Sequence, residues 1–151
     1  MENNLTLLAL FNLFLPLASF IIIIIFGKYI GNSAHWISLS LIGIMLLVSM
    51  LFFSNIFGQH GDILNVSTNW FTTGSFYVTL GILIDNVAAI MLLVVSLISF
   101  LVHLYSVEYM KGDPRYSRYF AYLGIFTFSM NGIVMADSLI MMYIFWELVG
   151  L

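Results

Sequence analysis

Cysteine is absent from this sequence, and charged residues make up only 7% of it. The lack of cysteine excludes disulfides and thiolate metal sites within these residues. A soluble domain has about 25% charged residues, so the scarcity of charge excludes that class. Hydrophobic residues supply 62% of the 151 positions. This composition predicts an integral membrane protein.

Basic residues are also missing from the first ten positions, which carry Glu2 but no Lys or Arg. A cleavable secretory signal begins with a positively charged region. We therefore expect the first hydrophobic segment to be retained in the membrane.

The hydrophobic runs predict an all-α integral membrane fold, because about 20 apolar residues suffice to cross a bilayer as a helix. Four complete transmembrane helices and the start of a fifth are expected, within one multi-spanning membrane domain that covers 1–151. Their approximate ranges are 5–26, 36–57, 81–105, 114–135 and 138–151. The fifth run stops short of a full crossing. We expect it to continue beyond Leu151, so that the chain is a fragment, a split gene product or an incomplete chain.

A long polar interval separates the second and third spans. It runs from Gly58 to about Leu80 and contains no Lys or Arg. Its centre, Thr73-Gly74-Ser75, lies between segments rich in aromatic and β-branched residues. This pattern predicts a β-hairpin on the membrane surface.

Polar residues also indicate where the helices begin and end. Residues Gly27 to His35 are expected to form a short polar turn. Asp113 followed by Pro114 predicts the start of the fourth helix, with the acid as its cap. Either Asp137 or Ser138 is expected to cap the fifth helix.

Asp85 stands at the expected start of the third helix, which begins near Gly81 or Asp85. A carboxylate there accepts backbone N–H groups and meets the positive end of the helix dipole. We favour this capping role over the alternative, a role in ion transfer.

Two polar faces are expected inside the helices. Asn12, Pro16 and Ser19 share one face of the first helix, which predicts a kinked surface packed against other helices. Ser96, Ser99, His103 and Ser106 form a polar stripe along the third helix. His103 is a candidate proton relay, since histidine changes charge near neutral pH. A structural histidine bonded to a neighbouring helix is the alternative.

All four basic residues fall on one side of the predicted topology. Lys28 lies in the first loop, and Lys111, Arg115 and Arg118 lie in or beside the third. The positive-inside rule assigns this side to the cytoplasm, or to the matrix in a mitochondrion. The N-terminus is then on the outer side of the membrane, which is the electrically positive side.

Glu147 is the acid for which a membrane position is hardest to explain. It lies about 13 to 14 Å into the fifth helix, near the middle of a hydrocarbon layer about 30 Å thick. An ionisable residue at that depth costs at least about 2.5 kcal/mol and usually marks an ion or proton route. Tyr143, Glu147 and Gly150 share one helix face. We therefore predict that Glu147 is the functional centre, held in a dry interior.

Five short motifs follow one another in the second half of the chain: Ile84-Asp85-Asn86, Val102-His103-Leu104-Tyr105-Ser106-Val107-Glu108-Tyr109-Met110, Arg118-Tyr119-Phe120-Ala121-Tyr122-Leu123, Ala136-Asp137-Ser138-Leu139, and Trp146-Glu147-Leu148-Val149-Gly150-Leu151. Their order and spacing resemble the N-terminal part of the antiporter-like membrane subunit of respiratory complex I. This subunit of NADH:quinone oxidoreductase is chain 5 in mitochondria and chain L in bacteria. The resemblance covers about residues 80 to 151.

The resemblance implies functions for particular residues. Glu147 matches a glutamate of a proton half-channel, which in the family pairs with a lysine on a later helix. Asp85 and His103 match recurrent family positions. The chain itself has no cysteine and no glycine-rich phosphate loop, so flavin, iron–sulfur clusters and quinone are expected in partner subunits. The isolated 151 residues are not expected to conduct protons.

The expected partners are other membrane subunits of the same complex and the lipid bilayer, without nucleic acid. The expected location is a bacterial inner membrane, a mitochondrial inner membrane or a thylakoid. An alternative reading is the large subunit of a multi-subunit sodium/proton antiporter. A membrane-bound hydrogenase relative and a scaffold in which Glu147 only bonds another helix are further alternatives.

Overall fold

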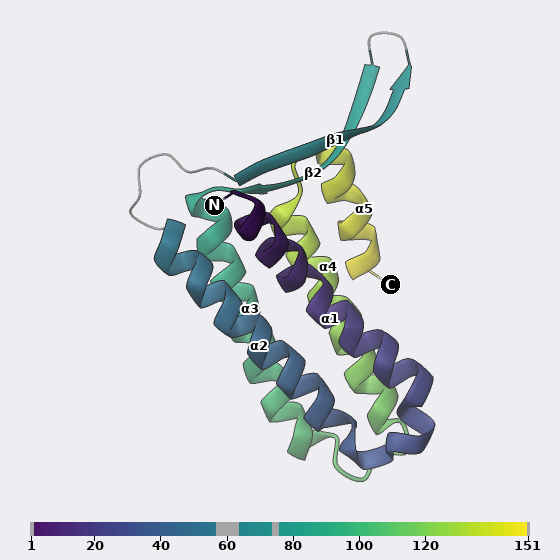
Figure 1. Ribbon diagram of the computed structural model, residues 1–151. Helices are drawn as coiled ribbons and strands as arrows, with labels where there is room; N and C mark the ends of the chain where they lie inside the picture. The colour runs from purple at the N-terminus through teal and green to yellow at the C-terminus, as the bar shows by residue number, and fades with distance from the viewer. Residues whose placement is uncertain (1, 57–63, 74–75, 151) are drawn as a thin grey trace.

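The computed structural model describes residues 2–56, 64–73 and 76–150. Helices and a hairpin make up this part of the chain (Figure 1). The elements are α1 (Glu2–Ile30), the 3-10 turn η1 (Gly31–Ser33), α2 (Ala34–Ile56), β1 (Leu64–Thr73), β2 (Phe76–Ile84), α3 (Asn86–Tyr109), α4 (Tyr116–Met135) and α5 (Leu139–Val149).

Three helices of the described chain are long and apolar enough to cross a membrane, namely α1 over Leu5–Ile30, α2 and α3. The predicted fourth span, α4, is 20 residues long but more polar. This helix packs against α1, α2, α3 and α5. Its Thr127, Ser129 and Asn131 are buried inside the bundle, where neighbouring helices rather than lipid surround them. The helical prediction is therefore confirmed, and three of the four predicted complete spans have the length and hydropathy needed to cross a membrane.

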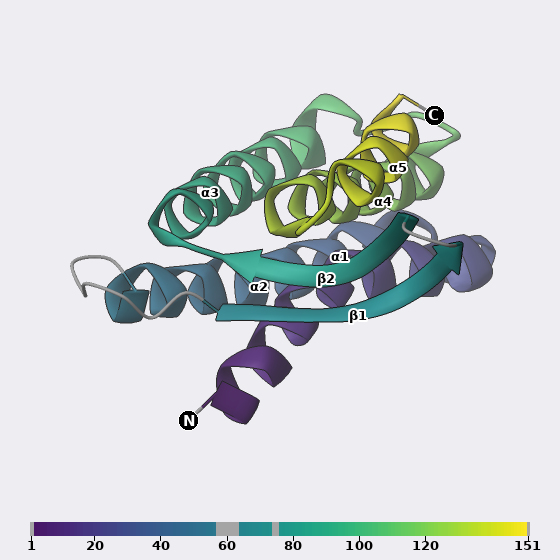
Figure 2. The same cartoon turned by 90° about the horizontal axis from the view of Figure 1, so that it is seen from above.

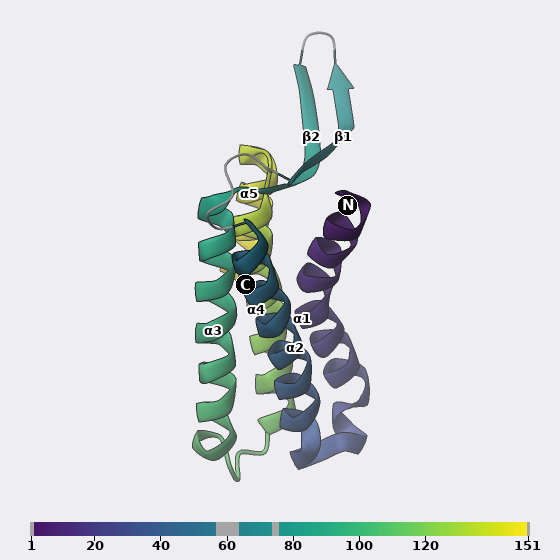
Figure 3. The same cartoon turned by 60° about the vertical axis from the view of Figure 1, so that its left-hand side comes forward.

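The predicted hairpin between the second and third helices is confirmed. β1 and β2 pair antiparallel, with Leu64 opposite Ile84. Leu64, Ile82 and Ile84 at its base are buried against the ends of the helices. The strands curve across these ends, and the far part of the hairpin projects away from the bundle (Figures 2 and 3). Residues 58–63 and 74–75 of the predicted interval lie outside the described residues.

Of the two predicted starts of the third span, Gly81 was wrong, because residues 81–84 belong to β2. The other, Asp85, is confirmed, since it is the N-cap of α3, which begins at Asn86. Gly81 is buried between β1 and Asp137, and a Cβ atom there would lie 2.6 Å from the Val66 carbonyl oxygen. The close contact with β1 therefore holds this segment in the sheet. The capping role of Asp85 is confirmed, since its Oδ1 accepts from the Ala88 N–H at 2.7 Å.

The predicted start of the fourth helix was also wrong. Arg115, not Asp113, occupies the N-cap position of α4, and it makes no side-chain capping bond. The Asp113 carboxylate instead accepts from the Arg115 N–H at 2.6 Å. This local bond closes a turn before the helix begins, so Pro114 lies in the turn rather than in the helix.

The predicted polar turn at Gly27–His35 is shorter than expected. α1 continues to Ile30 and α2 begins at Ala34. Ser117 of α4 explains the extension, because its hydroxyl donates to the carbonyls of Gly27 at 3.3 Å and Gly31 at 2.8 Å. The Gly31 carbonyl also accepts from the Ala34 N–H, so the Ser117 bonds hold the last turn of α1 against α4.

The polar face predicted on α1 is confirmed as a packing face. Asn12 donates to Ser49 at 3.0 Å, and Ser19 donates to Ser38 at 3.2 Å, both on α2. On the neighbouring side, Gly124 of α4 lies so close to α1 that an added Cβ would be 3.0 Å from the Pro16 carbonyl oxygen. α1 therefore packs against both α2 and α4.

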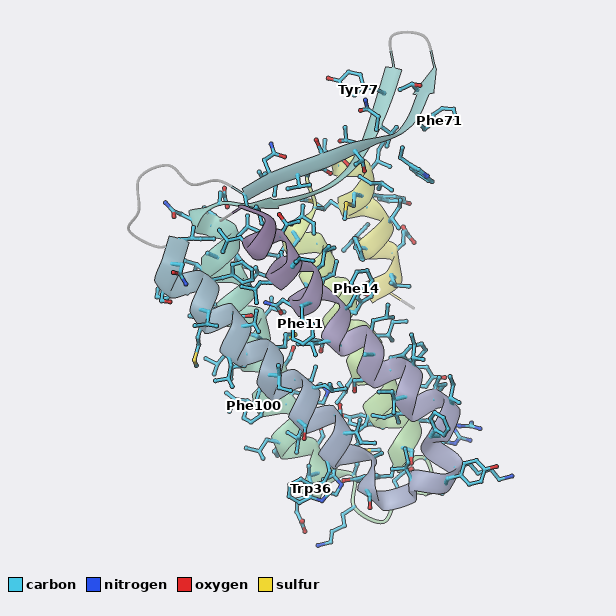
Figure 4. All side chains as sticks on the ribbon, viewed as in Figure 1. Phe11, Phe14, Trp36, Phe71, Tyr77 and Phe100 are labelled. Carbon is cyan, nitrogen blue, oxygen red and sulfur yellow. The ribbon has the colours of Figure 1, made fainter. Side chains whose placement is uncertain are left out.

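The basic residues lie at one end of the structure, as predicted. Lys28 belongs to the end of α1, whereas Lys111 and Arg115 lie between α3 and α4. These connections lie opposite the hairpin and the N-terminus (Figure 1). Trp36, which is 68% exposed, lies at the same end (Figure 4), where an aromatic residue suits the membrane interface.

Candidate functional site

The hairpin fixes the start of α5. Ser138, rather than Asp137, is the cap: its Oγ accepts from the Met141 N–H at 3.4 Å and donates to the Thr79 carbonyl of β2 at 2.9 Å. A single hydroxyl thus satisfies a free helix donor and attaches the turn between α4 and α5 to the sheet. α5 then runs beside α4 from the hairpin end of the bundle (Figure 1).

Phe145 sets the rotation of α5. Its ring lies directly over Gly132 of α4, which has no side chain to obstruct it, and meets Phe128 edge-on at 5.4 Å. Glu147 follows two residues later, and each helical residue turns the chain by about 100°. Because Phe145 faces α4, Glu147 points to nearly the opposite side.

Glu147 accordingly lies on an exposed face of α5, together with Tyr143 and Gly150. The predicted shared face is confirmed. The Tyr143 hydroxyl hydrogen-bonds to the Glu147 carboxylate one turn away. No residue of α5 within Leu139–Val149 is buried, so the residues described here do not supply the dry interior predicted for Glu147.

An apolar cavity of about 460 Å³ lies between α1, the hairpin and α5. Phe14, which Figure 4 shows on α1, lines it together with Trp70 and Phe145. None of its lining residues is titratable. The cavity therefore gives Glu147 no polar connection to the interior of the bundle.

His103 is 1% exposed and lies between α3 and α4, with its ring centroid 6.1 Å from that of Phe120. Its Nδ1 is 2.7 Å from the Ser99 carbonyl of its own helix. A carbonyl can only accept, so Nδ1 carries the hydrogen and Nε2 is left as an acceptor. Nε2 has no partner among the described residues. The hydrogen bond of the His103 ring is therefore to its own helix, whereas the structural alternative expected a bond to a neighbouring helix.

Two serines of the predicted stripe, Ser99 and Ser106, face α4, whereas the Ser96 hydroxyl donates to the Leu93 carbonyl of its own helix. Ser99 accepts from Thr127 at 3.2 Å, and Ser106 is 3.1 Å from the Tyr119 hydroxyl. These contacts place hydroxyl groups on both sides of His103. The stripe therefore joins the two helices by polar contacts.

The structure does not bring the three predicted site residues together. Asp85 caps α3 at the hairpin end, His103 is enclosed between α3 and α4, and Glu147 points away from α4. Within the described ranges, no three His, Asp or Glu residues gather as a metal site. Any proton path joining these residues needs further groups.

The sequence analysis did not single out Asn131, and it considered Asp137 only as a cap of the fifth helix. Asn131 is fully buried, and its Nδ2 lies 3.1 Å from the Met45 sulfur, while its Oδ1 has no partner in the described structure. Asp137 likewise has a buried Oδ1 without a described partner. The spacing of Thr127 and Asn131, four residues apart, was the available signal for a polar face on α4.

Residues 70–120 match the family described as NADH-Ubiquinone oxidoreductase (complex I), chain 5 N-terminus. The NADH-ubiquinone oxidoreductase chain 5 of Chondrus crispus is 39% identical over 140 residues, which are 92% of this chain. The chain is homologous to the N-terminal region of complex I chain 5. A second chain 5 relative, the NAD(P)H-quinone oxidoreductase chain 5 of Synechocystis sp., is 45% identical over 54% of this chain and 12% of its own length.

This chain 5 homologue spans 21% of the length of the Chondrus crispus relative. Among solved structures, it resembles a chain of the membrane-bound sulfane sulfur reductase, an archaeal respiratory membrane complex, with a TM-score of 0.77 at 15% identity. That match covers 93% of this chain and 28% of the other. It shows that the helix and hairpin arrangement is shared. The family match over 70–120 includes Asp85 and His103, whereas Glu147 lies outside it.

Proposed function

We propose that this chain is part of a proton-translocating membrane subunit of an NADH:quinone oxidoreductase, in which Glu147 takes up and releases the transported proton. The observation that carries the proposal is the position of Glu147, an exposed acid on the otherwise apolar helix α5, which packs against α4 of the bundle. The homology to chain 5 supports the same assignment.

The face that carries Glu147 requires a protein neighbour. A carboxyl group facing lipid at mid-depth costs at least about 2.5 kcal/mol, and such residues almost always face protein or a water-filled path. The chain spans only 21% of its Chondrus crispus relative. We propose that other parts of the assembled subunit cover Tyr143, Glu147 and Gly150.

Nearby charges would then control whether Glu147 is protonated or ionised. Enclosure in protein favours the protonated form of an acid, whereas a nearby cation favours its ionised form. A cation that moves toward and away from Glu147 would make the acid alternate between binding and releasing a proton. In the family resembled, this cation is a lysine on a later helix. The Tyr143 hydroxyl is placed to orient the carboxylate between the two states.

We also propose how the helices cross the membrane and which steps belong to partner subunits. α4 crosses the membrane as a fourth span, since it runs beside the three clear ones, and the basic end faces the cytoplasm or matrix. His103 and Asp85 are secondary candidates for proton transfer. Electron transfer through flavin, iron–sulfur clusters and quinone belongs to partner subunits.

A sodium/proton antiporter subunit is the second candidate function. The oxidoreductase names of the two relatives described above favour the first candidate. Co-purification with flavin and iron–sulfur subunits would support the oxidoreductase. Sodium-dependent proton exchange without an electron donor would support the antiporter.

The test is Glu147→Gln in the full-length subunit within its complex. Glutamine keeps the shape of the side chain but cannot carry the proton, so we expect the number of protons pumped per NADH oxidised to fall several-fold. Assembly and electron entry should be retained. Proton uptake and NADH oxidation are measured together in sealed vesicles.

Glu108→Gln is the matched control for this test. Glu108 is exposed and paired with Lys111 at 3.2 Å, a surface pair worth about 0–1 kcal/mol, so its loss should leave pumping unchanged. Normal pumping by the Glu147→Gln variant would refute the proposal.

A further inference from the structure

A cleft of about 490 Å³ lies between the end of α1 and the start of α4. We name it the basic cleft, because Lys28, Arg115 and Arg118 line it and no Asp or Glu does. These are three of the four basic residues in the sequence. The fourth, Lys111, is paired with Glu108 outside the cleft.

We propose that the basic cleft binds the phosphate head group of an anionic membrane phospholipid. Lys28, Arg115 and Arg118 are exposed, and none of them is in an ion pair within the described chain. Their charges are therefore not neutralised by this protein. Arginine is well suited to such a ligand, because its planar group donates two hydrogen bonds to a phosphate.

The start of α4 adds backbone donors to the same cleft. The N-cap residue Arg115 makes no capping bond with its side chain, and the backbone N–H groups of Ser117 and Arg118 have no acceptor among the described residues. Free N–H groups and the positive end of a helix dipole both favour an anion. The Ser117 hydroxyl, meanwhile, holds α4 to α1 through Gly27 and Gly31, which fixes both walls of the cleft.

The cleft also has an apolar wall, which favours a lipid over a free phosphate ion. Ile23, Ile24 and Tyr122 line it beside the basic groups. Ile24 is 43% exposed, and Ile21 and Ile25 beside it on α1 are 43% and 59% exposed. A head group held by the arginines can therefore lay an acyl chain along this apolar surface.

The basic cleft lies at a level in the membrane that suits a lipid head group. The cleft is at the end of the bundle that carries Trp36 (Figure 4). Tyr29 and Tyr109 near this end are 86% and 68% exposed. Aromatic side chains of this kind concentrate at the level of lipid head groups. Basic pockets between helices on the cytoplasmic or matrix side are typical binding sites for anionic lipids.

The experiment uses the purified full-length subunit in nanodiscs of equal parts phosphatidylglycerol and phosphatidylcholine. Native mass spectrometry then counts the lipids that remain bound. We expect phosphatidylglycerol to be enriched, and each of Arg115→Gln and Arg118→Gln to weaken its binding about 5-fold, the factor that corresponds to about 1 kcal/mol per cation.

Lys111→Gln is the matched control, because it removes one positive charge from the same end but outside the basic cleft. It should leave the enrichment unchanged. An equal loss in this variant would assign the enrichment to general surface charge and overturn the site. Size-exclusion chromatography checks folding, and the two single arginine variants give independent readings.

A second arm separates the lipid from free phosphate. Millimolar inorganic phosphate should not displace phosphatidylglycerol, because it lacks the acyl chain that the apolar wall contacts. Displacement by phosphate alone, or binding of dihexanoyl and long-chain lipids with equal strength, would overturn the lipid assignment. The outcome does not depend on Glu147, so the site and the proposed function can fail separately.

Discussion

Asn12 illustrates how single polar residues hold these helices together. It donates from α1 to Ser49 on α2, and Ser49 donates in turn to the Met45 carbonyl. Asn131 of α4 reaches the Met45 sulfur from the other side. Three helices thus meet at one small polar cluster in the interior. In a membrane bundle such contacts matter, because burial of apolar groups adds little when lipid is equally apolar.

We predict a measurable coupling between Asn12 and Ser49. In a double-mutant cycle with Asn12→Ala and Ser49→Ala, the interaction free energy should be about 0.6 kcal/mol and at most about 1.7 kcal/mol, the range found for hydrogen bonds between membrane helices. Reversible unfolding in micelles provides the measurement. The control pairs Asn12 with Ser54, whose hydroxyl bonds its own helix at Leu51; that coupling should be near zero. Equal coupling in both cycles would contradict the contact.

At the scale of elements, α5 depends on its contact with α4. Phe145 lies over Gly132, and no larger residue fits beneath the ring. Since this contact sets the rotation of α5, it also sets the direction of Glu147. A change at Gly132 should therefore disturb the candidate site without touching the acid.

Gly132→Ala is predicted to lower both stability and proton pumping in the full-length subunit. The added methyl group overlaps the Phe145 ring, and overpacking of this kind costs about 1–3 kcal/mol. Gly43→Ala is the control, because its Cβ would meet Phe100 at an ordinary 3.5 Å. Thermal unfolding and proton uptake are measured for both. Full pumping in the Gly132→Ala variant would show that the rotation of α5 is unimportant.

The helices were largely predictable from sequence, whereas several of their ends were not. Long apolar runs fix where helices form, and the caps Asp85 and Ser138 act locally. The extension of α1 to Ile30 depends on Ser117, which is remote in sequence. The extended conformation of Gly81 likewise depends on contacts with β1 and Asp137. Such long-range contacts leave no pattern in the residues nearby.

The candidate site was predictable only where it depends on residues close together in the sequence. A buried polar stripe containing His103 follows from spacing along α3. The outward direction of Glu147 does not, because it is set by Phe145 against Gly132 on another helix. The role of Asn131 depends on Met45, 86 positions earlier in the chain. The spacing of residues along a helix shows which of them share a face. Contacts with other helices determine the direction in which that face points.

At the scale of the whole molecule, the hairpin and the basic residues mark opposite ends (Figure 1). The positive-inside rule then predicts a fixed orientation in the membrane. A cysteine placed at Thr68, an exposed hairpin residue, should react with an impermeant maleimide from the outer side. A cysteine placed at Lys111 should react only from the inner side. The sequence contains no cysteine of its own, and labelling of both from the same side would contradict the topology.

The most direct test of the account is to observe the proton on Glu147 during turnover. Infrared difference spectroscopy of the full-length subunit within its complex detects carboxyl groups that gain or lose a proton. We predict a carboxyl signal that appears on turnover, persists in the Glu108→Gln variant and disappears in the Glu147→Gln variant. An unchanged signal in the Glu147→Gln variant would mean that another group carries the proton.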